Sequence, residues 1–232
     1  MSKERITRTF DFLGNPLIPV AASNDGGLWN SLTVETVGTP TVAVAAGKAK
    51  LALDNTDEAQ TAVLYWGDVL ALDIDQLNSV DIYARVGATI GATEDVMFGV
   101  AAAHNAAADS VADAAWFRAD GSDSILAQTD DGTNDLSAAT GLSISTTLRR
   151  YRIDFATGIK SNVGIASVGG KASVLFSGEN ANDLLRPVAR STQFDMSNYA
   201  GGFQLYARVD KSGGTGVPYL EIERFVVDYN RG

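Results

Sequence analysis

The sequence predicts an all-β protein, a single antiparallel β-sandwich with an extended N-terminal arm. Three observations support this fold class. Apolar and polar residues alternate in short runs, as in residues 80–86, which is typical of a strand with one buried face. The runs recur about every ten residues and are separated by Gly, Asn and Asp, the spacing of a sandwich or jelly roll. No repeat and no Pro- or Ser-rich linker divides the 232 residues. We therefore expect one sandwich domain over residues 23–232.

Residues 1–22 are predicted to form the arm. Arg8 and Phe10 mix charge with an apolar side chain, and two of the five prolines fall within residues 15–20, where they favour extended backbone. Such a segment is compatible with an interaction element that reaches a partner. It is equally compatible with the first edge strand of the sandwich.

Strand signals follow steadily from residue 41 onward. Alternation and turn residues predict strands over 41–45, 48–53, 61–66, 80–86, 96–100, 115–119, 125–128, 151–155, 163–166, 173–176, 203–209 and 219–229. Residues 105–115 are rich in alanine and predict a loop with one helical turn. Residues 178–196 have no clear strand pattern, and we expect a long crossover that lies over the sandwich.

Composition restricts the chemistry that the chain can perform. With 45% hydrophobic and 20% charged residues, the balance is that of a globular protein. The absence of cysteine excludes disulfides, thiolate catalysis and sulfur-ligated metals. His104 is the single histidine. A catalytic histidine base needs a nucleophile and an orienting acid beside it, and the sequence shows neither near His104. We therefore interpret His104 as a loop residue without a chemical role. These features predict a protein that is not an enzyme.

The net charge of −10 is concentrated in the middle of the chain. Residues 54–147 contain sixteen Asp or Glu and two Lys or Arg. Nucleic acid requires clustered cations, so we expect no nucleic-acid partner. The acidic segment is explained by solubility, and a partner with a basic patch or a bound cation remains an alternative. No signal peptide and no run of membrane-spanning length is visible, so we expect synthesis in the host cytoplasm and no membrane partner.

Two pairs of acidic residues are candidates for the two catalytic carboxylates of a glycosidase, which must lie at a suitable separation. Glu221 and Glu223 alternate within one predicted strand and therefore point to the same face. Asp73 and Asp75 have the same spacing near a turn. Spacing alone is a weak signal, and a solvated strand face commonly carries acids.

Other clusters also have simpler structural explanations. Asp120–Asp123 and Asp130–Asp135 gather oxygen donors that could bind calcium, but neither has the register of an EF-hand, and β-turns explain both. Gly169-Gly170 and Gly213–Gly216 are interpreted as hairpin tips, and Arg149–Arg152 spreads its cations over both faces of a strand. We assign no catalytic, cofactor-binding or metal-binding residue and no cofactor.

Trp29, Trp66 and Trp116 are the three tryptophans. We interpret them as core or rim residues, although an indole at the rim can also stack on a sugar.

The order of strands and turns resembles that of concanavalin A-like or laminin-G-like jelly-roll domains. The resemblance rests on Ala115–Ala119, the turn Thr129–Gly132, Arg149–Phe155, the hairpin into Val174–Phe176 and the closing Leu220–Tyr229. It covers roughly residues 29–229 as strand order without a specific motif. Such domains serve as lectins, as glycoside hydrolases and as virion structural proteins of tailed bacteriophages. Family 16 hydrolases carry a Glu-x-Asp-x-(x)-Glu strand, which Glu221 and Glu223 do not complete, so that activity is not implied.

The composition and the polar arm are most similar to those of phage head or tail accessory proteins. We therefore predict a non-enzymatic virion structural protein, a capsid decoration or accessory subunit located in the virion. Its expected partners are the major capsid protein or other virion subunits, with copies of itself in a homo-oligomer. The alternative is a lectin-like module that binds a glycan and attaches to a host or cell surface. A third hypothesis is a glycoside hydrolase that uses Glu221 and Glu223.

Overall fold

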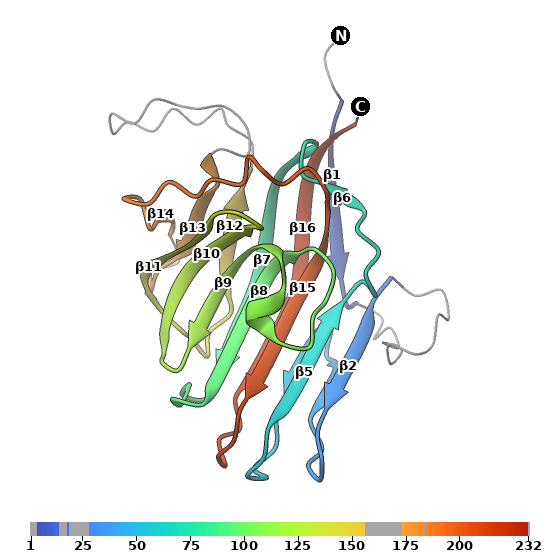
Figure 1. The fold of residues 1–232 in the computed structure, drawn as a ribbon, viewed down its shortest axis with the longest axis vertical. Coiled ribbons are helices and arrows are strands. Elements are labelled where there is room, and N and C mark those ends of the chain that lie inside the picture. Colours follow the sequence, from blue (N-terminus) through green and yellow to red (C-terminus); the bar gives the residue numbers. More distant parts are fainter. Residues whose placement is uncertain (1–3, 14–17, 19–27, 156–172, 183, 232) are drawn as a thin grey trace.

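The computed structural model describes residues 4–13, 18, 28–155, 173–182 and 184–231. These residues form two eight-stranded antiparallel sheets that pack face to face, as Figure 1 shows. The prediction of an all-β antiparallel sandwich of the jelly-roll type is confirmed. Within the described ranges, no helix combines the length and apolar character needed to cross a membrane.

The first sheet, called sheet A, has the order β14-β13-β12-β7-β16-β4-β3, and β1 also pairs with β16. Its strands are β14 (Leu185–Val188), β13 (Leu175–Glu179), β12 (Arg149–Asp154), β7 (Leu77–Gly87), β16 (Tyr219–Arg231), β4 (Lys48–Ala52), β3 (Thr41–Ala45) and β1 (Glu4–Asp11).

The second sheet, called sheet B, has the order β11-β10-β9-β8-β15-β5-β2, and β6 also pairs with β15. Its strands are β11 (Asp135–Ser143), β10 (Ser124–Asp131), β9 (Asp113–Asp120), β8 (Glu94–Ala101), β15 (Gly202–Lys211), β5 (Gln60–Tyr65), β2 (Asn30–Val34) and β6 (Leu72–Asp73). One 3-10 turn, η1 (Ala108–Ser110), lies between β8 and β9.

The core fills the space between the sheets. Alternate residues of each strand point into it, and an aromatic group at its centre joins the two layers. Phe117 of sheet B contacts Tyr151 and Phe176 of sheet A, with ring centroids 5.1 and 5.2 Å apart. Because these rings come from strands far apart in the sequence, their burial fixes how the sheets stack.

The N-terminal segment, for which a reaching arm and an edge strand were both left open, is a strand in its described residues. Glu4–Asp11 pair with residues 224–231 of β16 over their whole length, so this stretch is a strand of sheet A and not a free arm. Phe12 is fully buried, and its ring lies 5.2 Å from that of Trp29. The apolar residues that resembled an interaction element are therefore used within the fold, because they cover one end of the core. Residues 14–17 and 19–22 lie outside the described residues.

Most predicted strands are found with small shifts of their ends. The loop over 105–115 contains a single helical turn, as predicted. Residues 178–196 are not a plain crossover, because Leu185–Val188 pair with β13 as the edge strand β14. Pro187 lies within this strand and has no backbone N–H to donate. An edge strand tolerates this loss, but a proline in the sequence argues against a strand, so β14 was not predicted. The predicted strand over 163–166 and the Gly169-Gly170 hairpin fall outside the described residues.

Candidate functional site

A row of three aspartates crosses the outer face of sheet B. Val96, Phe98 and Val100 of β8 point into the core, so the intervening residues point outward. In the strand register, Asp210 of β15 lies opposite Asp95 of β8, which lies opposite Asp120 of β9. Opposite residues of neighbouring strands have Cβ atoms about 4.5–5.5 Å apart, so the three carboxylates are crowded on one face.

Two arginines in the next row compensate this charge. The Arg118 guanidinium donates to both oxygens of Asp95, with Nε 3.0 Å from Oδ1 and 2.8 Å from Oδ2. It also lies 3.5 Å from Asp120. Arg208 donates from Nε to Asp210 at 2.5 Å. Rigid strands carry all five side chains, so the groups are held in place before any ligand arrives.

The carboxylates of the row differ in exposure. The Asp120 side chain is 55% exposed, whereas those of Asp95 and Asp210 are 13% and 17% exposed. Oδ1 of Asp210 is buried and has no hydrogen-bond partner among the residues that the structure describes. Burial raises the pKa of Asp95 to about 6; the Arg118 pair opposes this shift, and the Asp120 and Asp210 charges add to it. Burial alone would lower the Arg118 pKa, but its pairs with Asp95 and Asp109 raise it, so Arg118 stays charged.

The raised pKa of Asp95 predicts how the stability of the protein depends on pH. An unfolded aspartate has a pKa of about 3.9, so between about pH 4 and pH 6 the folded state binds more protons at this site than the unfolded state. The contribution of Asp95 to the free energy of unfolding is therefore greatest below pH 4. It falls by about 3 kcal/mol as pH rises to 6 and beyond.

Asp95→Asn should remove this dependence. Urea unfolding of wild type and variant from pH 4 to pH 7 measures the difference between their unfolding free energies. That difference should change by about 3 kcal/mol in favour of the variant as pH rises. Curves that stay parallel across the range would show that Asp95 titrates normally.

Aromatic side chains occupy the next row of the same face. Tyr206 lies opposite Gly99, which lies opposite Trp116. Gly99 has no side chain to separate the two rings, and their centroids are 6.1 Å apart. A Cβ at Gly99 would approach the carbonyl oxygen of Ala115 to 2.3 Å, so the close backbone approach here requires glycine. Trp116 Nε1 donates to the side-chain oxygen of Gln128 at 2.9 Å.

His104 lies in a loop, as predicted, and its ring packs against this face. Its Nδ1 lies 2.9 Å from the Tyr206 hydroxyl, and its ring centroid lies 5.3 Å from that of Tyr65. Burial, followed by the charge of Arg208, lowers its pKa, so the ring is neutral at pH 7. No local pattern indicates this contact, because Tyr206 lies 102 positions along the chain from His104.

A hollow of about 360 Å³ lies over the aspartate row. It is bordered by all five charged residues of the row and its arginines, with loop residues on both sides; the further lining residues are Thr61, Ala92, Thr93, Glu94, Ala107, Ala108, Asp109, Lys211 and Ser212. Most of these groups are polar. The hollow therefore suits a ligand with many hydroxyl groups, which can donate to carboxylates and accept from guanidinium groups.

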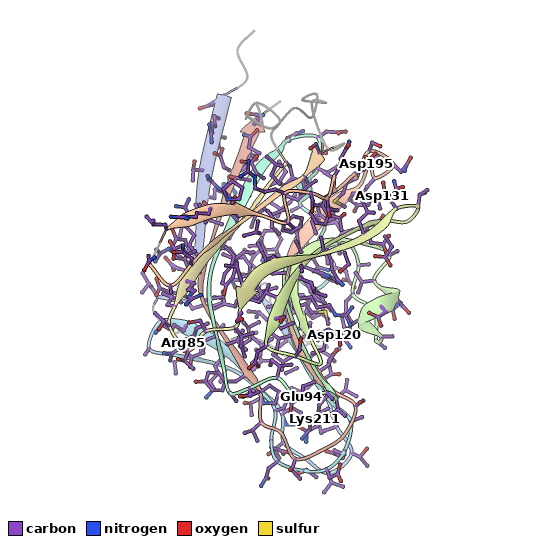
Figure 2. All side chains as sticks on the ribbon, turned by 90° about the vertical axis from the view of Figure 1, so that its left-hand side faces the viewer. Arg85, Glu94, Asp120, Asp131, Asp195 and Lys211 are labelled. Atoms are coloured by element: carbon purple, nitrogen blue, oxygen red, sulfur yellow. The ribbon has the colours of Figure 1, made fainter. Side chains whose placement is uncertain are left out.

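The carboxylates predicted from the sequence lie elsewhere. Glu221 and Glu223 are on the outer face of sheet A, the opposite side of the sandwich. Arg85 pairs with Glu221 at 2.7 Å, and Figure 2 shows Arg85 on the other side of the molecule from Asp120. Glu223 pairs with its neighbour Arg224 at a bulge in β16. Each acid is thus held in its own ion pair, and the two do not form an open catalytic pair.

Two further acidic clusters predicted from the sequence form turns. Asp130 and Asp131 accept hydrogen bonds from backbone amides of residues 132–134, and Asp73 accepts one from the Asp75 amide. Within the described part of the chain, no three Asp, Glu or His side chains are placed to hold a metal ion.

The tryptophans divide between the two faces of sheet B. Trp29 and Trp66 are buried in the core, as predicted. Trp116 lies on the outer face with Tyr206.

Comparison with known proteins identifies the fold. No family model matches the chain, and no curated protein matches its sequence. Among solved structures, a family GH16 endo-β-1,3(4)-glucanase, SCLam, is similar with a TM-score of 0.57 and 11% identity over 100% of this chain and 94% of that one. The carbohydrate recognition domain of Emp47p gives 0.51 and 11% over 93% and 95%. The Crh5 transglycosylase gives 0.51 and 12% over 95% and 83%.

These similarities establish a concanavalin A-like jelly roll. They also correct one prediction. The prediction that the chain is not an enzyme is wrong. It was based on the single histidine and the absence of cysteine, yet a glucanase and a transglycosylase have the same sandwich fold. A carbohydrate recognition domain shares it as well. Glycoside hydrolysis needs two carboxylates and neither histidine nor cysteine.

Of the aspartate row, only Asp120 was named from the sequence, as part of a possible calcium-binding turn; Asp95 and Asp210 were not. Asp95, Asp120 and Asp210 are separated by 25 and 90 positions and share no motif. One sequence signal was available: each of the three aspartates lies next to the end of a predicted strand with alternating apolar residues, where a charged side chain is expected to point outward. That signal does not reveal which strands are neighbours, and only the sheet order does.

Proposed function

We propose that the chain binds carbohydrate on the outer face of sheet B, at the row formed by Asp95, Asp120 and Asp210. The observation that carries the proposal is the register that places three carboxylates and two arginines on adjacent rigid strands beneath one hollow. Hydroxyl-rich ligands are recognised by such fixed charged groups, because each sugar hydroxyl both donates and accepts. The similarity to a carbohydrate recognition domain and a glucanase supports this assignment.

The charge of the hollow narrows the choice of glycan. Asp95, Asp109, Asp120 and Asp210 outnumber the two arginines, and Lys211 points away into a cage of backbone carbonyls. A sulfated or otherwise strongly anionic polymer is therefore disfavoured. Neutral glycans are the ligands to test first.

Asp120→Asn should lower glycan affinity at least tenfold. Asp120 is the most exposed carboxylate of the row, so its replacement should change stability little while removing a charged acceptor, which is worth about 1.5–3 kcal/mol. Calorimetry with laminarihexaose, cellohexaose and chitohexaose measures the affinity. Release of reducing ends in the same samples shows whether any of them is cleaved.

Glu223→Gln is the matched control, because it changes one half-exposed carboxylate to an amide on sheet A. It should leave the affinity unchanged. Loss of binding in Glu223→Gln with full binding in Asp120→Asn would move the site to sheet A. Absence of binding to all three hexasaccharides by the wild-type protein would count against the proposal.

The role as a capsid decoration subunit stays a prediction, as do the homo-oligomer and the virion location. Glycan binding is compatible with a virion protein that contacts a cell surface, so the two are not exclusive. Mass spectrometry of purified virions tests the location directly. Deleting residues 1–22 does not test an arm, because the deletion also removes β1 and the buried Phe12.

A further inference from the structure

Three aromatic side chains lie on the outer face of sheet B but do not contact solvent freely. Tyr65, Trp116 and Tyr206 are 6%, 5% and 0% exposed. Together with Val63 and Met97 they belong to a small apolar cluster that is separate from the main core. The outer face of an antiparallel sheet is ordinarily solvated, so this cluster requires a cover.

The cover is the loop of residues 102–112 between β8 and β9, which Figure 1 shows crossing in front of sheet B with η1 at its centre. Of residues 103–112, Val111 alone is fully buried, and most of the others are exposed. A loop with one buried apolar side chain and many exposed backbone groups belongs to the part of a protein that opens most easily.

The arginines of the aspartate row supply three of the hydrogen bonds that attach this loop, and others join His104 to Asp68 and Tyr206, and Ala102 to Gln204. Arg208 donates to the carbonyl oxygens of Asn105 and Ala106 at 2.8 and 2.6 Å. Arg118 donates to Asp109 at 2.6 Å. A ligand that takes hydrogen bonds from these guanidinium groups therefore competes with the loop for the same donors.

Space already exists beneath the loop. A cavity of about 110 Å³ lies between it and the sheet, lined by Trp116, Gln128 and Arg118 from the sheet and by Asp109 and Val111 from the loop. The cavity adjoins the aspartate row, because Arg118 and Asp109 border both hollows.

We propose that Tyr65, Trp116 and Tyr206 form a covered stacking subsite for the apolar face of a pyranose ring, which becomes accessible when loop 102–112 moves aside. This inference rests on the proposed function. The sugar ring would replace both His104 and Val111 over the aromatic side chains. The hydroxyls of the same glycan would accept hydrogen bonds from Arg118 and Arg208 in place of the loop. Glycan binding and loop opening would thus favour each other.

Weakening the loop tests the proposal. The double variant Asp109→Asn, Val111→Ala removes one charged attachment and most of the apolar anchor. It should bind the best of the three hexasaccharides about tenfold more tightly than wild type, because less of the binding energy is spent on opening. The gain should disappear when Trp116→Phe is added, because this change keeps one aromatic ring but removes the larger indole surface. Ala103→Ser, at an exposed loop position, is the control and should change nothing.

A readout without ligand separates this inference from the proposed function. Hydrogen exchange should be faster for amides of residues 104–111 than for β8 and β9, and the double variant should accelerate only the loop. Loop amides that exchange together with the strands would overturn the proposal. Equal affinity of wild type and double variant would overturn it while leaving glycan binding at the aspartate row intact. A double variant that binds none of the hexasaccharides would also overturn it.

Discussion

Arg118→Met is expected to lower the free energy of unfolding by about 3–5 kcal/mol at pH 7. The side chain of Arg118 is 11% exposed and that of Asp95 is 13% exposed, so the variant leaves a carboxylate in a buried position without its partner. Breaking a buried pair from one side costs this amount because the desolvated charge is no longer compensated. Asp120 and Asp210 increase the cost, since they repel the same charge.

The pH dependence of this loss distinguishes a charge effect from a packing effect. Without Arg118, the pKa of Asp95 should rise further, and the carboxyl can become neutral at modest acidity. The destabilisation measured by urea unfolding should therefore shrink between pH 7 and pH 5. Asp95→Asn combined with Arg118→Met should recover part of the stability at pH 7. A deficit that is the same at both pH values would contradict the explanation. The single variant should also lose glycan binding, because the ligand site loses the Arg118 donors.

Lys211→Met is expected to cost about 3 kcal/mol. Lys211 is 3% exposed, and the three donors of its Nζ lie among four backbone carbonyl oxygens: Asp54 at 2.6 Å, Thr56 at 2.7 Å, Gly214 at 3.0 Å and Gly216 at 3.4 Å. The ammonium therefore ties the β4–β5 connection to the β15–β16 connection. Methionine fits the space but leaves the carbonyls without this donor, and hydrogen bonds from a charged group are worth about 1.5–3 kcal/mol each before desolvation is deducted.

Two further variants sharpen the Lys211 prediction. Lys211→Arg should not restore stability, because a planar guanidinium cannot direct its donors to four converging carbonyls as an ammonium does. Lys48→Met, at a partly exposed position of β4, should stay within about 0.5 kcal/mol of wild type. Chemical unfolding at pH 7 measures all three. A Lys211→Met protein as stable as Lys48→Met would show that the carbonyl cage does not stabilise the connections.

The fold was largely predictable because strand alternation is a local property. The periodicity of residues 80–86 and 203–209 identified β7 and β15, and turn residues between runs indicated an antiparallel sandwich. Strands without strong alternation were missed. β11 has small, weakly apolar residues, and β14 contains a proline. The N-terminal strand remained ambiguous, because Phe10 and Phe12 serve equally well in an interface or in a core.

The candidate site could not be predicted, and Glu221 with Glu223 illustrates why. Two acids close in sequence attract attention, yet both are neutralised by adjacent arginines on sheet A. Asp95 and Asp210 have no such local signature. Their proximity arises because β8 and β15 are neighbours in sheet B although about a hundred residues separate them.

The amino-acid sequence by itself determined the strand periodicity, the antiparallel sandwich and the acidic middle segment, because each depends on residues within a few positions of one another. The tertiary structure alone decided that Asp95, Asp120 and Asp210 form one row, that Lys211 is buried among carbonyls, and that a loop covers Trp116 and Tyr206. The physical reason is that strand order and register bring distant residues together, and burial then changes the charge and hydrogen bonding of each group.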